Sequence, residues 1–167
     1  MRKTFREQRS PDYWASRWDN IQVDAPAQGH DRYPLLHAEM VVGRPLGEIL
    51  ELGCGAGRLV RHYHGKGVKI VGVDNIAGAI RKLHECDTTL NVIHADARRL
   101  PFETDRFATV LCFGVYHSLE DDVPLAIQET FRVLKPGGRL CAEFRADTLH
   151  NRLIDRYMKG NGVQNSI

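Results

Sequence analysis

Short apolar runs alternate with amphipathic stretches along most of the chain. The runs that predict β-strands cover residues 48–52, 69–73, 91–94, 107–113 and 139–144. The stretches between them predict helices over 56–64, 77–86 and 124–134. Because the strand segments lack the polar/apolar alternation of a half-solvated sheet, they predict parallel strands covered by helices on both faces. The expected fold class is therefore α/β, a doubly wound sheet of about five parallel strands.

Two further helices are expected ahead of the first strand. Ser10 and Pro11 supply an N-cap and a first helical residue for a helix that carries Trp14 and Trp18 on one face. A second helical segment, 34–42, leads into the first strand. We expect a single domain over 1–167. Its predicted parts are a helical lid over 1–46, a core over 47–146, and a helix and tail over 147–167.

The composition favours a soluble protein without a dedicated macromolecular partner. Lys and Arg number 23 against 21 Asp and Glu in 167 residues, so the net charge of +2 gives no strongly basic face for nucleic acid. The four cysteines show no metal-ligand spacing and predict reduced core thiols. No apolar segment is long enough to be a signal peptide core or a membrane span. We expect a cytoplasmic protein that contacts neither nucleic acid nor membrane.

A glycine-rich turn follows the first strand and opens a helix. The run E-L-G-C-G-A-G from Glu51 to Gly57 lets a ligand approach the backbone at Gly53 and Gly55. A tight turn without any ligand is the structural alternative. The spacing also differs from the dinucleotide pattern G-x-G-x-x-G, because the third glycine comes one residue early.

Carboxylates follow the second and third strands. Asp74 could accept both hydroxyl hydrogens of a ribose, which would serve NAD and other nucleosides equally, or it could simply cap the next helix. Asp96 and Ala97 begin the run D-A-R-R-L-P-F, which has no counterpart in a hydride-transfer enzyme. The dinucleotide hypothesis is therefore disfavoured.

Together these runs resemble class I S-adenosylmethionine-dependent methyltransferases of the ubiquinone/menaquinone type. The resemblance rests on the glycine turn, Asp74, the D-A-x-x-L-P-F run and the L-K-P-G-G-x-L run that begins at Leu134, and it covers about 13–144. It implies a Rossmann-like fold and S-adenosylmethionine as the cofactor, with S-adenosylhomocysteine as the product. The resemblance implies that Glu51 contacts the ammonium of S-adenosylmethionine, that Asp74 contacts its ribose, and that Asp96 and Ala97 contact its adenine. In the family an apolar residue follows the ribose acid and packs on the adenine; here Asn75 comes before Ile76, so either of these two residues is the expected adenine neighbour.

The residues beside the reacting methyl group are expected after the fourth strand. Residues 113–117 would lie beside the sulfonium, with Phe113 against the cofactor. His117 could act as a general base or be only a structural member of the loop. The segment 110–121 resembles the V-L-H-H-L-x-D pattern of small-molecule methyltransferases, which implies O, C or N of a small molecule as the acceptor. It lacks the N-P-P-[YF] tetrapeptide of amino methyltransferases, which argues against adenine and glutamine as acceptors. An RNA or protein methyltransferase and a non-catalytic cofactor-binding remnant are the alternatives.

The two ends of the chain raise further expectations. By resemblance, the N-terminal helices form a lid, with Tyr13, Trp14, Arg17, Trp18 and Tyr33 as candidates; surface packing is the alternative. The family fold ends in an antiparallel hairpin, for which 148–167 offers no strands. The strand 139–144 would then be an open edge with an uncovered apolar face. We therefore expect either a truncated chain or a homodimer through that edge.

Overall fold

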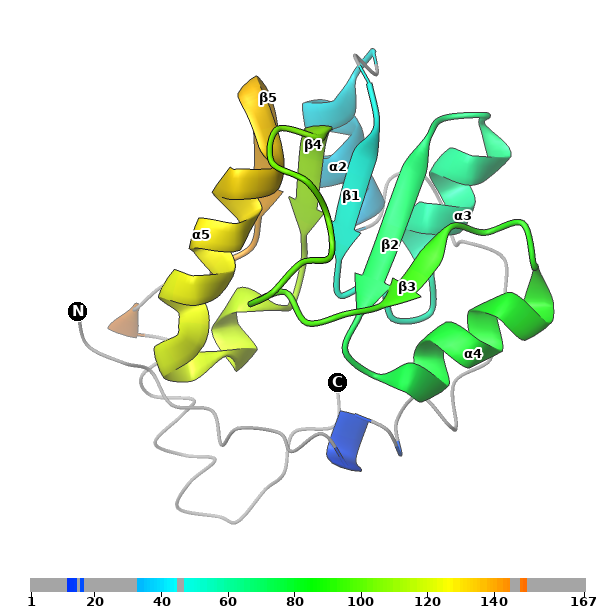
Figure 1. Cartoon of the computed structure of the whole chain (residues 1–167), viewed down its shortest axis with the longest axis horizontal. Helices are drawn as coiled ribbons and strands as arrows, with labels where there is room; N and C mark the ends of the chain where they lie inside the picture. The colour runs from blue at the N-terminus through cyan, green and yellow to red at the C-terminus, as the bar shows by residue number, and fades with distance from the viewer. Residues whose placement is uncertain (1–11, 15, 17–32, 45–46, 145–147, 150–167) are drawn as a thin grey trace.

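The fold is a five-stranded parallel sheet with helices on both faces. The computed structural model describes residues 12–14, 16, 33–44, 47–144 and 148–149. The strands stand in the order β3-β2-β1-β4-β5 and all pairs are parallel (Figure 1). Their bounds are β1 Ile49–Leu52, β2 Ile70–Asp74, β3 Val92–His94, β4 Phe107–Cys112 and β5 Leu134–Ala142. The α/β class and the doubly wound sheet predicted from the sequence are confirmed.

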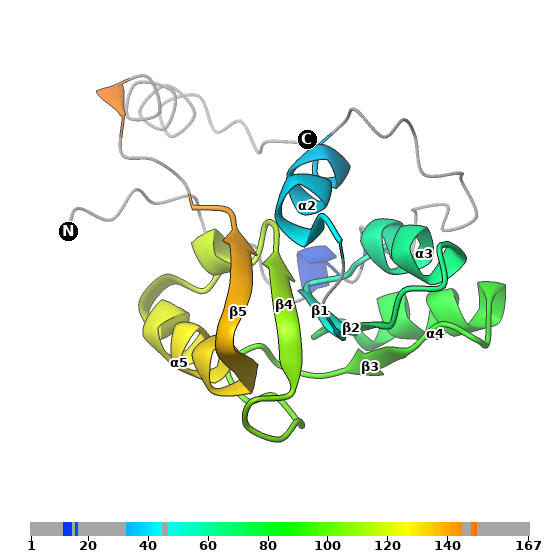
Figure 2. The ribbon, with the colours of Figure 1, turned by 90° about the horizontal axis from the view of Figure 1, so that it is seen from above.

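Helices pack against the sheet in two separate layers (Figure 2). One core cluster joins Ile49, Ile70 and Leu111 of the sheet to buried side chains of three helices, and the other lies under the fourth helix and the segment 95–102. Alternate residues of β1 face the two clusters, as the period of a strand requires. The first layer contains α2 Leu35–Val42, α3 Arg58–Gly65 and α4 Ala77–Cys86, and the second contains α5 Val123–Val133.

The last strand begins earlier than the apolar pattern indicates. The apolar run predicts a strand from residue 139, whereas β5 starts at Leu134, directly after α5. Leu134 pairs with Phe107, and Arg139 pairs with Thr109, so the residues between form an irregularity in the ladder. Gly137, with φ of 74°, allows this bulge. The L-K-P-G-G run is thus part of the strand's bulged start.

Helix α2 covers one face of β5. The Arg139 guanidinium donates to the carbonyls of Val41 and Val42 at 2.9 and 3.3 Å, which caps the C-terminal end of the helix. Helix α5 packs on the other face. The expectation of an uncovered apolar face on this strand is therefore wrong. Within the described residues the outer edge of β5 pairs with no further strand.

Several expectations concern residues outside the described part. Of the predicted N-terminal helix, only residues 12–14 and 16 are described, and the Tyr13 and Trp14 rings meet edge to face at 5.3 Å. Arg17, Trp18 and the predicted helix over 148–158, apart from its first two residues, lie outside the described residues. None of the described helices is long and apolar enough to cross a membrane.

Candidate functional site

The strand order brings the predicted site residues to one edge of the sheet. β1 lies between β2 and β4, and the chain changes direction across the sheet at this point. Ligands of open α/β sheets bind beyond the carboxyl ends of the strands at such a switch point. Glu51 lies in β1, Asp74 ends β2, and Asp96 follows β3. The three acids therefore come from three adjacent strands.

The glycine turn after β1 is held tightly by its neighbours. The N–H groups of Gly53 and Cys54 both donate to the Val73 carbonyl, at 2.8 and 2.9 Å. Gly53 has φ of +70°, and a Cβ there would lie 2.3 Å from Cγ2 of Val115. The turn therefore needs glycine both for its backbone conformation and for contact with the segment after β4.

Glu51 is a buried carboxyl group of β1 that reaches the first turn of helix α3. Its side chain is 6% exposed, and Oε2 accepts a hydrogen bond of 3.1 Å from the Val60 N–H. Burial raises the pKa of Glu51 from 4.5 to about 8, although the Val60 N–H and the nearby charge of Arg58 act in the opposite direction. A buried carboxylate with so little compensation would gain from a cationic ligand.

Asp74 joins the glycine turn to the next helix. Its Oδ2 accepts from the Gly55 N–H and its Oδ1 from the Ile76 N–H, both at 2.9 Å. The side chain is 7% exposed, and burial raises its pKa despite these two hydrogen bonds. A carboxylate has about four acceptor positions, so Asp74 keeps capacity for a ligand. The Ile76 N–H belongs to the residue before α4 and not to the first turn of that helix, so this hydrogen bond closes a local turn. The ligand role of Asp74 stays a prediction.

Asp96 is held by an arginine that the sequence analysis did not single out. The Arg98 guanidinium bonds both carboxylate oxygens of Asp96, with Nε at 2.9 and 3.0 Å and Nη2 at 2.6 Å, and its Nη1 bonds Asp122. The Arg98 hydrogen bonds hold the pKa of Asp96 below its usual range. The signal for Arg98 in the sequence is only its position two residues after the acid.

The other predicted site residues lie along the same edge. Asn75 is exposed, and its carbonyl meets Nε2 of His94 at 3.1 Å, whereas Ile76 and Ala97 are buried. Phe113 is half-buried at the end of β4, and His117 is exposed in a short 3-10 helix. Their roles toward a ligand stay predictions.

A second missed residue, Glu143, directly follows β5. Its Oε2 accepts from the Gly114 N–H at 3.1 Å and from the Tyr33 hydroxyl. The Tyr33 ring meets Phe113 edge to face, with 5.6 Å between centroids. Tyr33, predicted as a lid residue, therefore contacts the carboxyl ends of β4 and β5.

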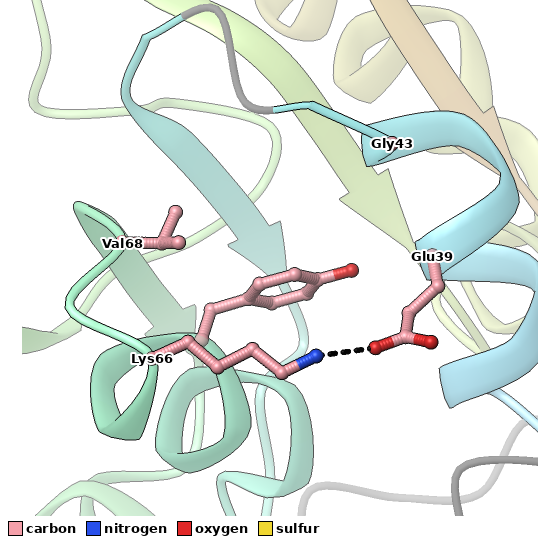
Figure 3. Close-up of a pocket in the computed structure, with 5 residues that line it drawn as sticks. Glu39, Gly43, Lys66 and Val68 are labelled. Atoms are coloured by element: carbon pink, nitrogen blue, oxygen red, sulfur yellow. Dashed lines mark hydrogen bonds and ion pairs between the residues drawn. The ribbon is translucent and has the colours of Figure 1, made fainter.

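A pocket of about 300 Å³ lies between α2 and α3, away from these acids (Figure 3). The pocket is lined by Glu39, Gly43, Tyr63, Lys66 and Val68. Lys66 and Val68 precede β2, so the pocket lies at the amino end of the sheet. Lys66 reaches Glu39 at 2.6 Å, as the dashed line in Figure 3 shows. Glu39 also meets His62 at 2.9 Å, so this cluster fixes α2 against α3.

Metal and disulfide chemistry find no support in the described part of the chain. No group of three or more His, Cys, Asp or Glu side chains there is placed to hold a metal ion. All four cysteines are free thiols; Cys54 and Cys112 are buried and Cys141 half-buried. Cys86 is exposed at the end of α4, so the expectation of core thiols is wrong for that residue.

Fold and site together place a glycine turn and three acidic residues at the carboxyl edge of a parallel sheet. Residues 50–142 match the family model described as "Methyltransferase domain". The chain is 34% identical over 139 residues to a demethylmenaquinone methyltransferase of Clavibacter sepedonicus, covering 78% of this chain and 56% of that protein. It is 32% identical over 126 residues to a carboxy-S-adenosyl-L-methionine synthase of Vibrio cholerae, covering 67% and 51%.

A solved structure supports the same assignment. The crystal structure of a SAM-dependent methyltransferase from Methanosarcina mazei superposes with a TM-score of 0.62 at 28% identity, covering 76% of this chain and 64% of that one. The chain belongs to the class I S-adenosylmethionine-dependent methyltransferase family. It spans about half the length of the curated relatives it matches.

Proposed function

We propose that this protein transfers the methyl group of S-adenosylmethionine to a small molecule. The observation that carries the proposal is the pair of buried carboxyl groups, Glu51 and Asp74, on either side of the glycine turn. S-adenosylmethionine carries an ammonium and a sulfonium, whose charges would offset the desolvation of these acids. An anionic dinucleotide would instead add negative charge beside them.

The chain's own residues suggest how such a ligand would be held. Glu51 would attract the ammonium, Asp74 would accept from the ribose hydroxyls, and Asp96 would accept from the adenine amino group. The Gly53 and Gly55 backbone would leave room for the ligand's body, while Asn75, Ala97 and Phe113 would border its base and sulfur ends. When bound, the ligand supplies an activated methyl group, so the protein's main contribution is to align the acceptor and exclude water.

Calorimetry on the purified protein tests the cofactor. S-adenosylhomocysteine should bind, and NADH should not. Asp74→Ala should weaken binding, whereas Glu103→Gln, which changes an exposed carboxylate before β4, should not. Binding of NADH without S-adenosylhomocysteine would refute the proposal, and unchanged affinity in the Asp74 variant would refute the ribose role.

The acceptor is proposed to be a small molecule because the relatives include enzymes named for a quinone. The name of the Clavibacter sepedonicus relative specifies demethylmenaquinone. A screen of small-molecule, RNA and protein pools with methyl-labelled S-adenosylmethionine would identify the acceptor class. Label in RNA or protein alone would replace the small-molecule proposal, and no label in any pool despite cofactor binding would favour a non-catalytic binding protein.

We further propose that the outer edge of β5 is covered by a second copy of the chain. The support is the open edge within the described residues and the exposed aromatic side chains of Phe131 and Phe144. Light scattering on the purified protein tests this directly. A stable monomer would refute the homodimer.

A further inference from the structure

Among the described residues, Glu143 uses only one of its two carboxylate oxygens. Its backbone N–H donates to the Cys112 carbonyl at 2.9 Å, which fixes the residue at the carboxyl end of β4. Both donors to its side chain, the Gly114 N–H and the Tyr33 hydroxyl, reach the same atom, Oε2. Among the residues that the structure describes, Oε1 receives no hydrogen bond or ion pair. One acceptor oxygen is therefore left over.

The Glu143 carboxylate lies beside segment 113–115, which we expect to border the reacting methyl group. Gly114 stands between Phe113, which contacts the Tyr33 ring, and Val115, which lies against Gly53 of the glycine turn. The segment 113–115 thus contacts the glycine turn on one side and Glu143 on the other. Burial and the Glu143 carboxylate raise the pKa of Tyr33, and Arg58 of the turn acts on the same hydroxyl. Tyr33 is therefore a protonated donor at neutral pH, and it holds Oε2 rather than Oε1.

We propose that Oε1 of Glu143 binds the O–H or N–H of the methyl acceptor and takes its proton. The inference rests on the proposed function and names the residue that would bind the methyl acceptor. A purely structural role, fixing Gly114 and Tyr33, would need Oε2 alone. The site then favours acceptors that present a hydroxyl or an amine.

The proposed step is balanced in atoms and charge. The acceptor's lone pair forms the bond to the methyl carbon, and the electron pair of the broken C–S bond stays on sulfur, leaving a neutral thioether. The acceptor's proton moves to Oε1, so the carboxylate becomes a carboxylic acid. The positive charge of the sulfonium and the negative charge of Glu143 disappear together.

Sinefungin tests the geometry without knowledge of the acceptor. In this analogue an amine-bearing carbon replaces the methylated sulfonium, so its N–H groups project where the methyl group would lie. We would measure its affinity and that of S-adenosylhomocysteine by calorimetry for the wild type, Glu143→Ala, Glu143→Gln and the control Glu103→Gln. Glu143→Ala should weaken sinefungin by about tenfold or more, the effect of losing a charged hydrogen bond, and S-adenosylhomocysteine by less than about threefold.

The outcomes separate this inference from the proposed function. An unchanged ratio of the two affinities in both Glu143 variants would overturn the inference, and so would a parallel loss of both ligands, because that would indicate a structural role through Gly114. If Glu143→Ala fails to fold, Glu143→Gln decides, since it keeps an acceptor oxygen for the Gly114 N–H and removes the charge. A wild type that binds neither ligand would instead refute the proposed function, and the inference with it.

Discussion

Replacing Glu51 by Gln would remove the most strongly shifted carboxyl group at the glycine turn. The amide has nearly the same shape and keeps an oxygen that can accept from the Val60 N–H. The substitution therefore changes mainly the ability to ionise. In the wild type, burial raises the pKa of this carboxyl from 4.5 to about 8.

The sign of the pH effect follows from the direction of the shift. Between pH 4.5 and about 8 the folded protein holds the Glu51 proton, whereas the unfolded chain has released it. The stability contributed by this proton is full below pH 4.5 and is lost as the pH rises through about 8. At about 1.4 kcal/mol for each pH unit, the total loss is roughly 5 kcal/mol.

Urea denaturation of the ligand-free protein, from about pH 5 to about pH 9, measures this loss. The free energy of unfolding of Glu51→Gln should match the wild type at the acid end and exceed it by several kcal/mol at the alkaline end. Asp74, whose pKa is also raised, stays in both proteins, so its contribution cancels in the comparison. Glu103→Gln, the matched control, should follow the wild type throughout. Parallel profiles for Glu51→Gln and wild type would refute the reasoning.

Three other substitutions test further parts of the site. Arg98→Met should raise the pKa of Asp96. The affinity of this variant for S-adenosylhomocysteine, measured by calorimetry, should therefore fall more between about pH 7 and pH 5 than that of the wild type. Equal pH profiles for the two proteins would contradict this. Thr130→Val should cost about 1–3 kcal/mol in urea denaturation, because the buried Tyr116 hydroxyl, now 2.7 Å from Oγ1 of Thr130, loses that hydrogen bond. His117→Ala should lower turnover by less than about 10²-fold once an acceptor is known; a larger loss with intact cofactor binding would make His117 the base.

The local sequence determined the sheet, its helices and the position of the glycine turn. Short apolar runs without alternation can be buried only between two helical layers, and glycines can adopt the backbone angles of the turn at little cost. Helix α4 was predicted to its observed bounds, Ala77–Cys86, because its apolar period and its ends are local features. The acids after the strands could be predicted because parallel strands place their carboxyl ends at one edge.

Only the tertiary structure decided which side chains share a site across that edge. Glu143 and Tyr33 are 110 residues apart, and Arg98 and Asp122 are 24 apart, so no local period links them. Their contacts depend on strand order and on the docking of α2 against β5, which also covers the face that the sequence indicates as bare. Hydrogen bonds of this kind form between segments that meet only after folding. A residue pattern along the chain therefore predicts where each strand ends. Which side chains form hydrogen bonds at that end depends on the assembled sheet.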